Sequence, residues 1–267
     1  MPRHFRSGAH HATQTEQRSV GVTIGLIGYG RFGKFAAEHL AKRAHVLVFD
    51  VKRNRGKFPS RRIRAADLQH VAAQRVVVLA VPISALQATL RAIAPLVMPG
   101  SLIIDVCSVK MHPVRWMKAL LPPTVFILGT HPLFGPDSAT ASLRSHRVVV
   151  CPVRIARGVL STVRQHLGAV GVVCTTMTPE AHDRFMAETL LLAQCVGRVV
   201  AQTDVRHHPY GTASYERLMN LAQTADNDTR ELFHDMVKYN PYAVGVLRRL
   251  LRAQRKVLKD LPVRLLP

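Results

Sequence analysis

The chain of 267 residues contains two regions that differ in their pattern of apolar and polar positions. From Val22 to about Thr175, short β-branched apolar runs alternate with segments of helical spacing, which is typical of a parallel sheet covered by helices. Strands are predicted at 22–27, 45–49, 76–80, 102–105, 125–128, 147–151 and 170–174. Helices are predicted at about 31–43, 84–96, 112–120 and 156–167, and the basic segment 51–74 gives no clear pattern.

After Thr175 the pattern is helical, with prolines separating long helical stretches and no further strand indicated. Thr178 is a predicted N-cap, Pro179 occupies the first helical position and Glu180 lies in the first turn, where its charge favours the helix dipole. The helix that they begin should run to about Thr203. We expect the boundary between the two regions near residue 176.

A glycine-rich loop follows the first predicted strand, where Gly28, Gly30 and Gly33 form the pattern Gly-x-Gly-x-x-Gly at the start of a helix. The first glycine permits a tight turn, the second lets the backbone approach a pyrophosphate, and the third allows close packing of helix on strand. This pattern predicts an α/β fold with a Rossmann-type, dinucleotide-binding domain at 21–176. The helical pattern that follows predicts an all-helical domain at 177–267, and the apolar faces of its helices at 181–203 and 243–258 make it the expected dimerisation domain.

Asp50 ends the second predicted strand, where a carboxylate accepts hydrogen bonds from the ribose hydroxyls of the cofactor. A carboxylate repels a 2′-phosphate, so Asp50 favours NAD. Lys52, Arg53 and Arg55 follow at once and could hold that phosphate instead, which leaves NADP as the alternative cofactor.

Two polar loops follow later strands, at 105–110 and 129–138. Ligands of open parallel sheets bind at the carboxyl ends of the strands, so these loops should border the nicotinamide. His131 follows a predicted strand end and is held by Pro132, which makes it a candidate catalytic residue. Ser108 is a second candidate, with a loop cap as its structural alternative.

These motifs resemble the prephenate and arogenate dehydrogenases of tyrosine biosynthesis over about residues 21–245. The other matching segments are 80–84, 178–183, 196–198, 214–218 and 239–242. The resemblance implies that hydride leaves the ring carbon bearing the hydroxyl for the nicotinamide, while loss of the ring carboxylate makes the ring aromatic. It implies that His131 takes the hydroxyl proton and that Ser108 orients it; an imidazole with an unperturbed pKa of about 6.5 suits that role.

The expected binding residues follow from the glycine motif and the resemblance. Cofactor contacts are expected from Gly28, Tyr29, Gly30, Arg31, Phe32, Gly33, Asp50, Val81, Pro82 and Ser108. Substrate contacts are expected from Ser108, His131, Gly135, Pro136, Asp137, Gln194 and Arg217.

Some positions in the helical region bear on the substrate. Gln194 stands where similar proteins often have a histidine, and glutamine cannot carry charge to a substrate carboxylate. Arg217 and Lys238 are candidates to neutralise that carboxylate. His182 and Asp183 are interpreted mainly as packing or pocket support.

The first functional expectation is a prephenate dehydrogenase that forms 4-hydroxyphenylpyruvate with NAD; the alternative is an arogenate dehydrogenase that forms tyrosine. A 3-hydroxyacid dehydrogenase or an imine reductase of similar two-domain plan is the other alternative among enzymes. The hydroxyacid enzymes would be expected to carry a catalytic lysine in the helical domain, and no lysine lies between Lys118 and Lys238. A non-catalytic basic binding protein on the same scaffold is the alternative outside the enzymes.

The net charge of +21 comes from basic residues scattered along the chain, which indicates a solvated surface that can steer anionic substrates. We therefore expect a small-molecule substrate and no nucleic-acid partner. Apolar runs are too short to span a membrane, and the basic segment 1–20 lacks the apolar region of a secretory signal. We expect a disordered tail there and a cytoplasmic homodimer.

The four cysteines are Cys107, Cys151, Cys174 and Cys195, and their wide spacing predicts reduced thiols. No Cys-x-x-Cys pair occurs, and the pair His207-His208 lacks nearby partner ligands. We therefore expect no metal site.

Overall fold

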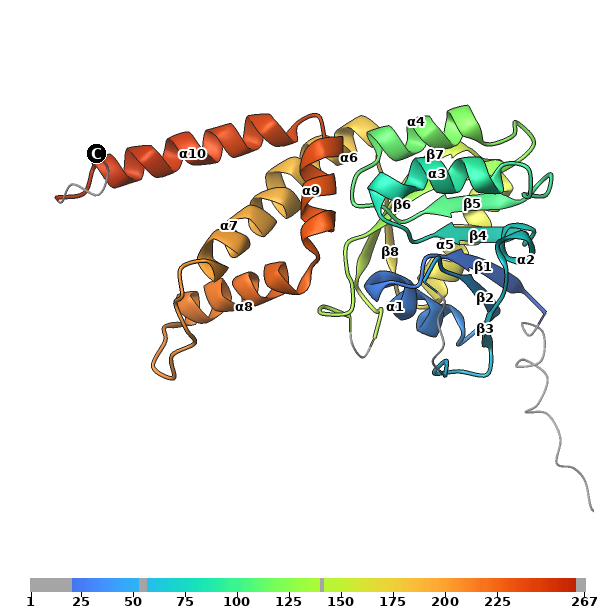
Figure 1. Cartoon of the computed structure of the whole chain (residues 1–267), viewed down its shortest axis with the longest axis horizontal. Coiled ribbons are helices and arrows are strands. Elements are labelled where there is room, and N and C mark those ends of the chain that lie inside the picture. The colour runs from blue at the N-terminus through green and yellow to red at the C-terminus, as the bar shows by residue number, and fades with distance from the viewer. Residues whose placement is uncertain (1–20, 53–56, 140–141, 263–267) are drawn as a thin grey trace, which may run out of the picture.

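The computed structural model describes residues 21–52, 57–139 and 142–262. It contains an eight-stranded sheet with the order β3-β2-β1-β4-β5-β6-β7-β8 (Figure 1). The strands are β1 (Thr23–Ile27), β2 (His45–Phe49), β3 (Ile63–Ala65), β4 (Val76–Leu79), β5 (Leu102–Asp105), β6 (Phe126–Pro132), β7 (Arg147–Arg154) and β8 (Val173–Thr176). This mostly parallel sheet confirms the expected Rossmann-type fold.

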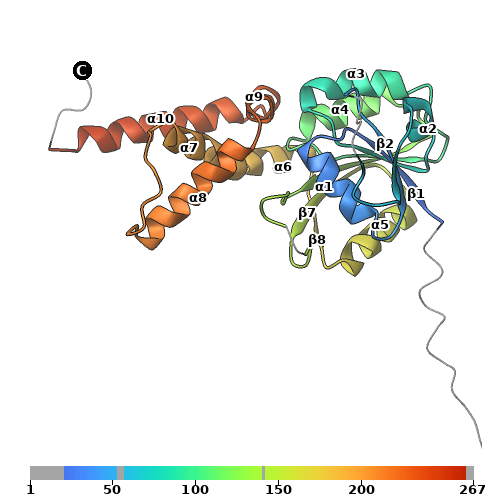
Figure 2. The same ribbon diagram turned by 60° about the horizontal axis from the view of Figure 1, so that its bottom comes forward.

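Helices cover both faces of the sheet. Figures 1 and 2 show α3 and α4 on one face and α1 and α5 on the other. Their bounds are α1 (Arg31–Leu40), α2 (Leu68–Ala72), α3 (Ile83–Ile93), α4 (Met111–Leu120) and α5 (Arg157–Ala169). Buried aliphatic residues of the strands fill the core between these layers, including Leu79, Ile103 and Ile127, which are fully buried.

The predicted strands are all present, with ends that differ by a few residues, and the unassigned segment 51–74 contributes the short strand β3 and the helix α2. The expected parallel sheet has one exception among the described strands, because β7 runs antiparallel to β6. The described residues between these two strands form no crossover helix, the connection that parallel neighbours usually have.

The helical region begins as the sequence predicts. Thr178 is the N-cap of α6 (Pro179–Met186), and its hydroxyl accepts a 3.1 Å hydrogen bond from the Ala181 N–H. A π-helical segment, η1 (Ala187–Leu191), joins α6 to α7 (Leu192–Ala201). Three more helices follow, which are α8 (Ala213–Asn227), α9 (Arg230–Tyr239) and α10 (Ala243–Lys259).

The last helix, α10, projects away from the sheet in both ribbon views (Figures 1 and 2). Only Ala243 and Val246 of its 17 residues are buried. Among the described helices, none is long and apolar enough to cross a bilayer. The predicted tail 1–20 lies outside the described residues, and the division into domains near residue 177 stays a prediction.

Candidate active site

The carboxyl edge of the sheet gathers the loops that the sequence singles out. Asp105, the last residue of β5, pairs with Gly129 of β6, so β6 continues beyond its neighbour through Thr130 and His131. His131 was expected in a loop after a strand. It lies within β6 instead, because the antiparallel partner β7 pairs with that strand as far as Pro132.

The glycine loop has the close packing that its motif requires. Gly28 has a φ of 98°, and a Cβ there would lie 2.3 Å from the carbonyl oxygen of Ala80. A Cβ on Gly33 would lie 2.2 Å from the carbonyl oxygen of Gly28, whereas one on Gly30 would meet open space. No side chain caps the first turn of α1, so the loop fits a dinucleotide pyrophosphate.

Asp50 lies beside this loop. Its carboxylate accepts hydrogen bonds from the N–H groups of Tyr29, at 2.5 Å, and Lys52, at 2.8 Å. The Tyr29 ring turns into the core and packs edge-on against Phe58, so its backbone rather than its ring faces the loop. Arg53 and Arg55 lie outside the described residues.

The other expected cofactor residues surround the same edge. Val81 and Pro82 follow β4, and Pro82 precedes the first residue of α3. The Phe32 ring packs at a tilt against Phe35, with ring centroids 5.9 Å apart. Arg31, at the first position of α1, forms ion pairs with Asp137 and with Asp228.

His131 belongs to a buried chain of hydrogen bonds that joins the sheet to α6. Its Nδ1 lies 2.9 Å from Nε2 of His182, and Nδ1 of His182 lies 2.7 Å from Oδ1 of Asp183. His182 and Asp183 are fully buried, and His131 is 7% exposed. The Asp183 carboxylate also accepts the N–H groups of Lys110, at 2.6 Å, and Met111, at 2.8 Å.

A buried ion pair lies next to this series of hydrogen bonds. The Lys110 ammonium, which is fully buried, contacts Asp105 Oδ1 and donates a 2.6 Å hydrogen bond to the carbonyl of Thr130. The Thr130 hydroxyl donates in turn to the carbonyl of Asp105, at 2.6 Å. These bonds tie the end of β5 to β6 next to His131.

Burial, with smaller effects of His182 and the Lys110 ammonium, lowers the pKa of His131 well below its usual 6.5. The sequence analysis assumed the ordinary pKa for His131, so its titration is now expected at more acidic pH. The ring is therefore neutral at neutral pH and can accept a proton. Burial also lowers the pKa of His182, although its hydrogen bond to Asp183 opposes the shift.

Ser108 follows β5 at the same edge of the sheet. Its hydroxyl is buried and has no hydrogen-bond partner among the described residues. A buried hydroxyl without a partner costs free energy, so such an atom is often explained by an absent ligand. This fits the expected place of Ser108 between cofactor and substrate.

A second polar cluster joins the glycine loop to the helical region. The buried Gln194 donates its Nε2–H to Asp228 Oδ2 at 2.8 Å, while its Oε1 has no partner among the described residues. Asp228 also pairs with Arg31, which holds Asp137 at the same time. Burial raises the pKa of Asp228, although Arg31 and the Gln194 amide favour its charged form.

The remaining expected substrate residues differ in their surroundings. Gly135 and Pro136 are half-buried in the turn after β6, and the Ser138 hydroxyl accepts the Gly135 N–H at 3.0 Å. Arg217 is exposed on α8, and the described structure gives it no contact with the groups around His131. Lys238 is exposed on α9 and lies over the Tyr239 ring.

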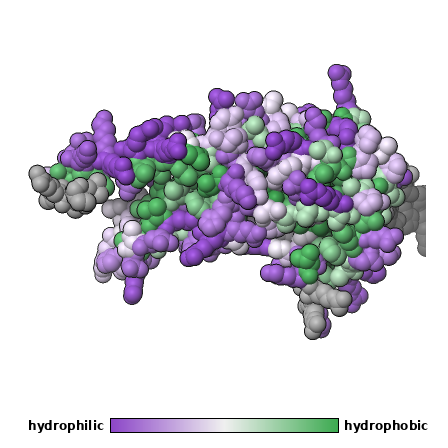
Figure 3. All heavy atoms as spheres, turned by 45° about the horizontal axis from the view of Figure 1, so that its top comes forward, coloured by the Kyte–Doolittle hydropathy of each residue, from purple (hydrophilic) through white to green (hydrophobic). Residues whose placement is uncertain are grey.

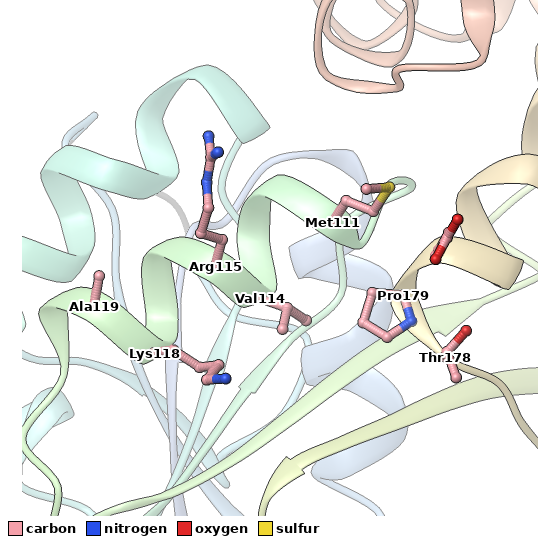
Figure 4. Close-up of a pocket in the computed structure, with 8 residues that line it drawn as sticks. Met111, Val114, Arg115, Lys118, Ala119, Thr178 and Pro179 are labelled. Carbon is pink, nitrogen blue, oxygen red and sulfur yellow. The ribbon is translucent and has the colours of Figure 1, made fainter.

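A hollow of about 540 Å³ lies elsewhere, between α4 and the start of α6 (Figure 4). Its lining is Met111, Val114, Arg115, Lys118, Ala119, Thr178, Pro179 and Glu180. It contains none of the residues that the sequence assigned to cofactor or substrate. The described residues also contain no cluster of three metal-binding side chains.

The sequence argument missed several polar partners. Lys110 was placed in a motif without a role, Asp228 was not singled out, and His182 was interpreted as packing or pocket support without its contact to His131. The adjacent pair His182-Asp183 next to a helix N-cap was the available signal. No sequence pattern marks Asp228 as a neighbour of Gln194.

Comparison with known proteins identifies the nucleotide-binding part. Residues 60–176 match the family model described as prephenate dehydrogenase, nucleotide-binding domain. Residues 199–266 match one described as TYRAAT1-like, C-terminal domain. Two observations therefore support a nicotinamide-type cofactor: the glycine loop, and the match to a nucleotide-binding domain of dehydrogenases.

Two relatives come from Arabidopsis thaliana. Arogenate dehydrogenase 2, chloroplastic, is 30% identical over 92% of this chain and 71% of its own length. Arogenate dehydrogenase 1, chloroplastic, is 29% identical over 91% of this chain but only 40% of its own length.

Solved structures share the fold. The prephenate dehydrogenase of A. aeolicus, in complex with hydroxyphenyl propionate and NAD+, has a TM-score of 0.69 at 16% identity and covers 90% of each chain. Synechocystis arogenate dehydrogenase has a TM-score of 0.64 at 21% identity, covering 88% of this chain and 89% of its own. By its sequence relatives, this chain belongs to the arogenate/prephenate dehydrogenase family of oxidoreductases.

Proposed function

We propose that this chain oxidatively decarboxylates a cyclohexadienyl substrate, arogenate in preference to prephenate, with NAD as the hydride acceptor. The observation that carries the proposal is the position of His131. This buried residue lies in the part of β6 that continues past the end of β5, at the same edge of the sheet as the glycine loop. A histidine that is neutral at neutral pH is suited to take the proton of the reacting ring hydroxyl.

In this proposal, bound nicotinamide supplies the hydride acceptor, and the chain positions the reacting groups. His131 accepts the hydroxyl proton, and the otherwise unpartnered Ser108 hydroxyl orients that group. Burial of both side chains excludes water from the reacting atoms and strengthens each hydrogen bond there.

NAD is preferred over NADP because of Asp50. Two backbone N–H groups hold its carboxylate beside the glycine loop, and its remaining lone pairs suit the ribose hydroxyls. A 2′-phosphate at that place would meet the carboxylate charge.

Arogenate is preferred because of the polar cluster around Asp228. Arogenate differs from prephenate by an ammonium in place of a keto group, and a carboxylate that burial destabilises gains from a nearby cation. The names of the two Arabidopsis relatives support this choice over our first expectation of prephenate. Prephenate is the second candidate, because the Gln194 amide would donate to its keto oxygen.

The direct test is a spectrophotometric assay with arogenate or prephenate and with NAD or NADP, in all four pairs. We expect reduced cofactor with the highest kcat/KM for arogenate and NAD. Absence of turnover in every pair, together with steeply salt-dependent binding to nucleic acid, would instead support the non-catalytic basic protein.

We also propose a homodimer formed through the helical region. Figure 3 shows apolar surface on this region beside the hydrophilic band of α10. Exposed apolar residues here include Val199 on α7 and Val244, Leu251 and Val257 on α10. A monomer rarely leaves such a helix uncovered. Light scattering at micromolar concentration should give twice the chain mass, and a monomer mass would contradict this proposal.

We propose the cytoplasm as the location of this chain. The names of the Arabidopsis relatives specify the chloroplast for those proteins. Imaging of the full chain with a C-terminal fluorescent tag would separate the two compartments.

A further inference from the structure

The hydrogen-bond chain from His131 to Asp183 determines where the ring protons lie. Asp183 receives two backbone N–H groups, those of Lys110 and Met111, on its two carboxylate oxygens. Its main-chain carbonyl is bound separately by the Asn240 amide, at 2.7 Å. Both carboxylate oxygens thus already act as acceptors, and an ionised carboxylate has no proton to donate.

Because Asp183 only accepts, the nitrogen of His182 that faces it must carry a proton. That nitrogen is Nδ1, 2.7 Å from Asp183 Oδ1. A neutral imidazole has one protonated nitrogen, so Nε2 of His182 is left as an acceptor.

The same reasoning applies to the ring of His131. His182 Nε2 faces Nδ1 of His131 at 2.9 Å, so His131 must donate there through a protonated Nδ1. In neutral His131 the other nitrogen, Nε2, then carries a free lone pair. Among the described residues, no group forms a hydrogen bond to that nitrogen.

We propose that His182, oriented by Asp183, is a positioning residue that holds neutral His131 in the Nδ1-protonated tautomer, so that Nε2 is the atom that removes the substrate proton. This inference rests on the proposed function for the identity of the substrate. The arrangement of the two rings is a property of the protein alone.

The proton and electron balance is complete within the proposed reaction. The hydroxyl O–H bond breaks and an N–H bond forms at His131 Nε2, while the ring hydride passes with its electron pair to oxidised nicotinamide. The bond to the ring carboxylate then breaks, carbon dioxide leaves, and its electron pair makes the ring aromatic. The resulting phenolate oxygen takes the proton back from Nε2.

His182 also stabilises the transient imidazolium of His131. The charged ring keeps its Nδ1–H bond to His182, whose own Nδ1–H is held by the Asp183 carboxylate. The Lys110 ammonium opposes this charge but is paired with Asp105. Loss of His182 should therefore slow proton transfer without weakening cofactor binding.

The decisive measurement is a long-range ¹H–¹⁵N correlation of the imidazole groups in the ¹⁵N-labelled full chain, with His131 and His182 signals assigned by their loss in H131N and H182L. Near neutral pH, both rings should show a protonated Nδ1 and an unprotonated Nε2. In H182L, His131 should gain the Nε2-protonated form. A parent His131 that is protonated at Nε2 would overturn the inference, even if H182L does not fold.

Kinetics supply the second readout. H182L should lower kcat by about 10- to 10³-fold with unchanged cofactor Kd, and H182Q, which keeps an acceptor, should recover part of the loss. H166L, at an exposed histidine of α5, is the control and should leave kcat unchanged. An H182L enzyme with parental kcat and tautomer would overturn the role of His182. A parent with the expected tautomer but no turnover would instead refute only the proposed function.

Discussion

Lys110 and Asp183 lie 73 residues apart in the sequence, yet the backbone N–H of Lys110 donates a 2.6 Å hydrogen bond to Asp183 Oδ1. Lys110 precedes α4 in the sheet region, whereas Asp183 lies in α6, the first helix of the helical region. The ammonium of the same lysine reaches Asp105 at the end of β5. One residue thus connects the sheet edge to the helix that supports His131.

We predict that Lys110→Met destabilises the protein, because Asp105 would stay buried without its cation. The free energy of unfolding should fall by about 3 to 5 kcal/mol. The matched substitution Lys118→Met, on the exposed face of α4, should change it by less than about 0.5 kcal/mol. Equal denaturant midpoints for the two variants would contradict the buried pair.

Ser108→Ala should lower kcat about tenfold or more but leave stability within about 1 kcal/mol of the parent, since the hydroxyl has no partner in the described structure. Ser101 offers a matched control. Its buried hydroxyl is also unpartnered within the described residues, but it precedes β5 and so lies at the opposite edge of the sheet. Ser101→Ala should keep the parental kcat. If both variants lose activity equally, Ser108 has no special role.

Asp50→Ala should reduce the preference for NAD over NADP, since the ribose hydroxyls lose an acceptor and the phosphate loses a repelling charge. The ratio of the two kcat/KM values should fall about tenfold, the equivalent of roughly 1.4 kcal/mol. Glu38→Ala removes the same charge from the exposed side of α1 and should not move the ratio. An unchanged ratio in Asp50→Ala would show that this carboxylate does not bind the ribose.

Asp228→Asn should shift the substrate preference from arogenate toward prephenate, because the ammonium loses a charged partner and the keto group gains an amide donor. We expect the ratio of kcat/KM values to fall about tenfold or more. Asp226→Asn, at an exposed position two residues earlier, is the control. If Asp228→Asn keeps the parental ratio of kcat/KM values, this carboxylate does not contribute to the choice between arogenate and prephenate.

The sequence predicts the sheet well because its central strands are short, continuous apolar runs, such as Val76–Leu79 in β4. It misses β3, whose three residues include an arginine and lie in a basic segment. It also ends β6 too early, since Gly129 and Pro132 have little strand preference and are held there by pairing with β7.

The active site is only partly predictable for a similar reason. The glycine motif is local, and its turn and helix follow from a few adjacent residues. The contact between His131 and His182 spans 51 residues and depends on how α6 packs against the sheet edge. The depressed pKa of His131 follows from that packing too, because burial is its main cause.

The central claim is that His131 is the base, and the pH dependence of kcat/KM in the parent and in His131→Asn tests it most directly. The base must be neutral, and burial lowers its pKa, so parental activity should rise with pH through a midpoint below 6.5 and then stay level. His131→Asn should lower kcat by about 10² to 10⁴ fold and abolish that acidic limb, with cofactor Kd unchanged. A variant that turns over arogenate and prephenate as fast as the parent, with the same acidic limb, would contradict the account.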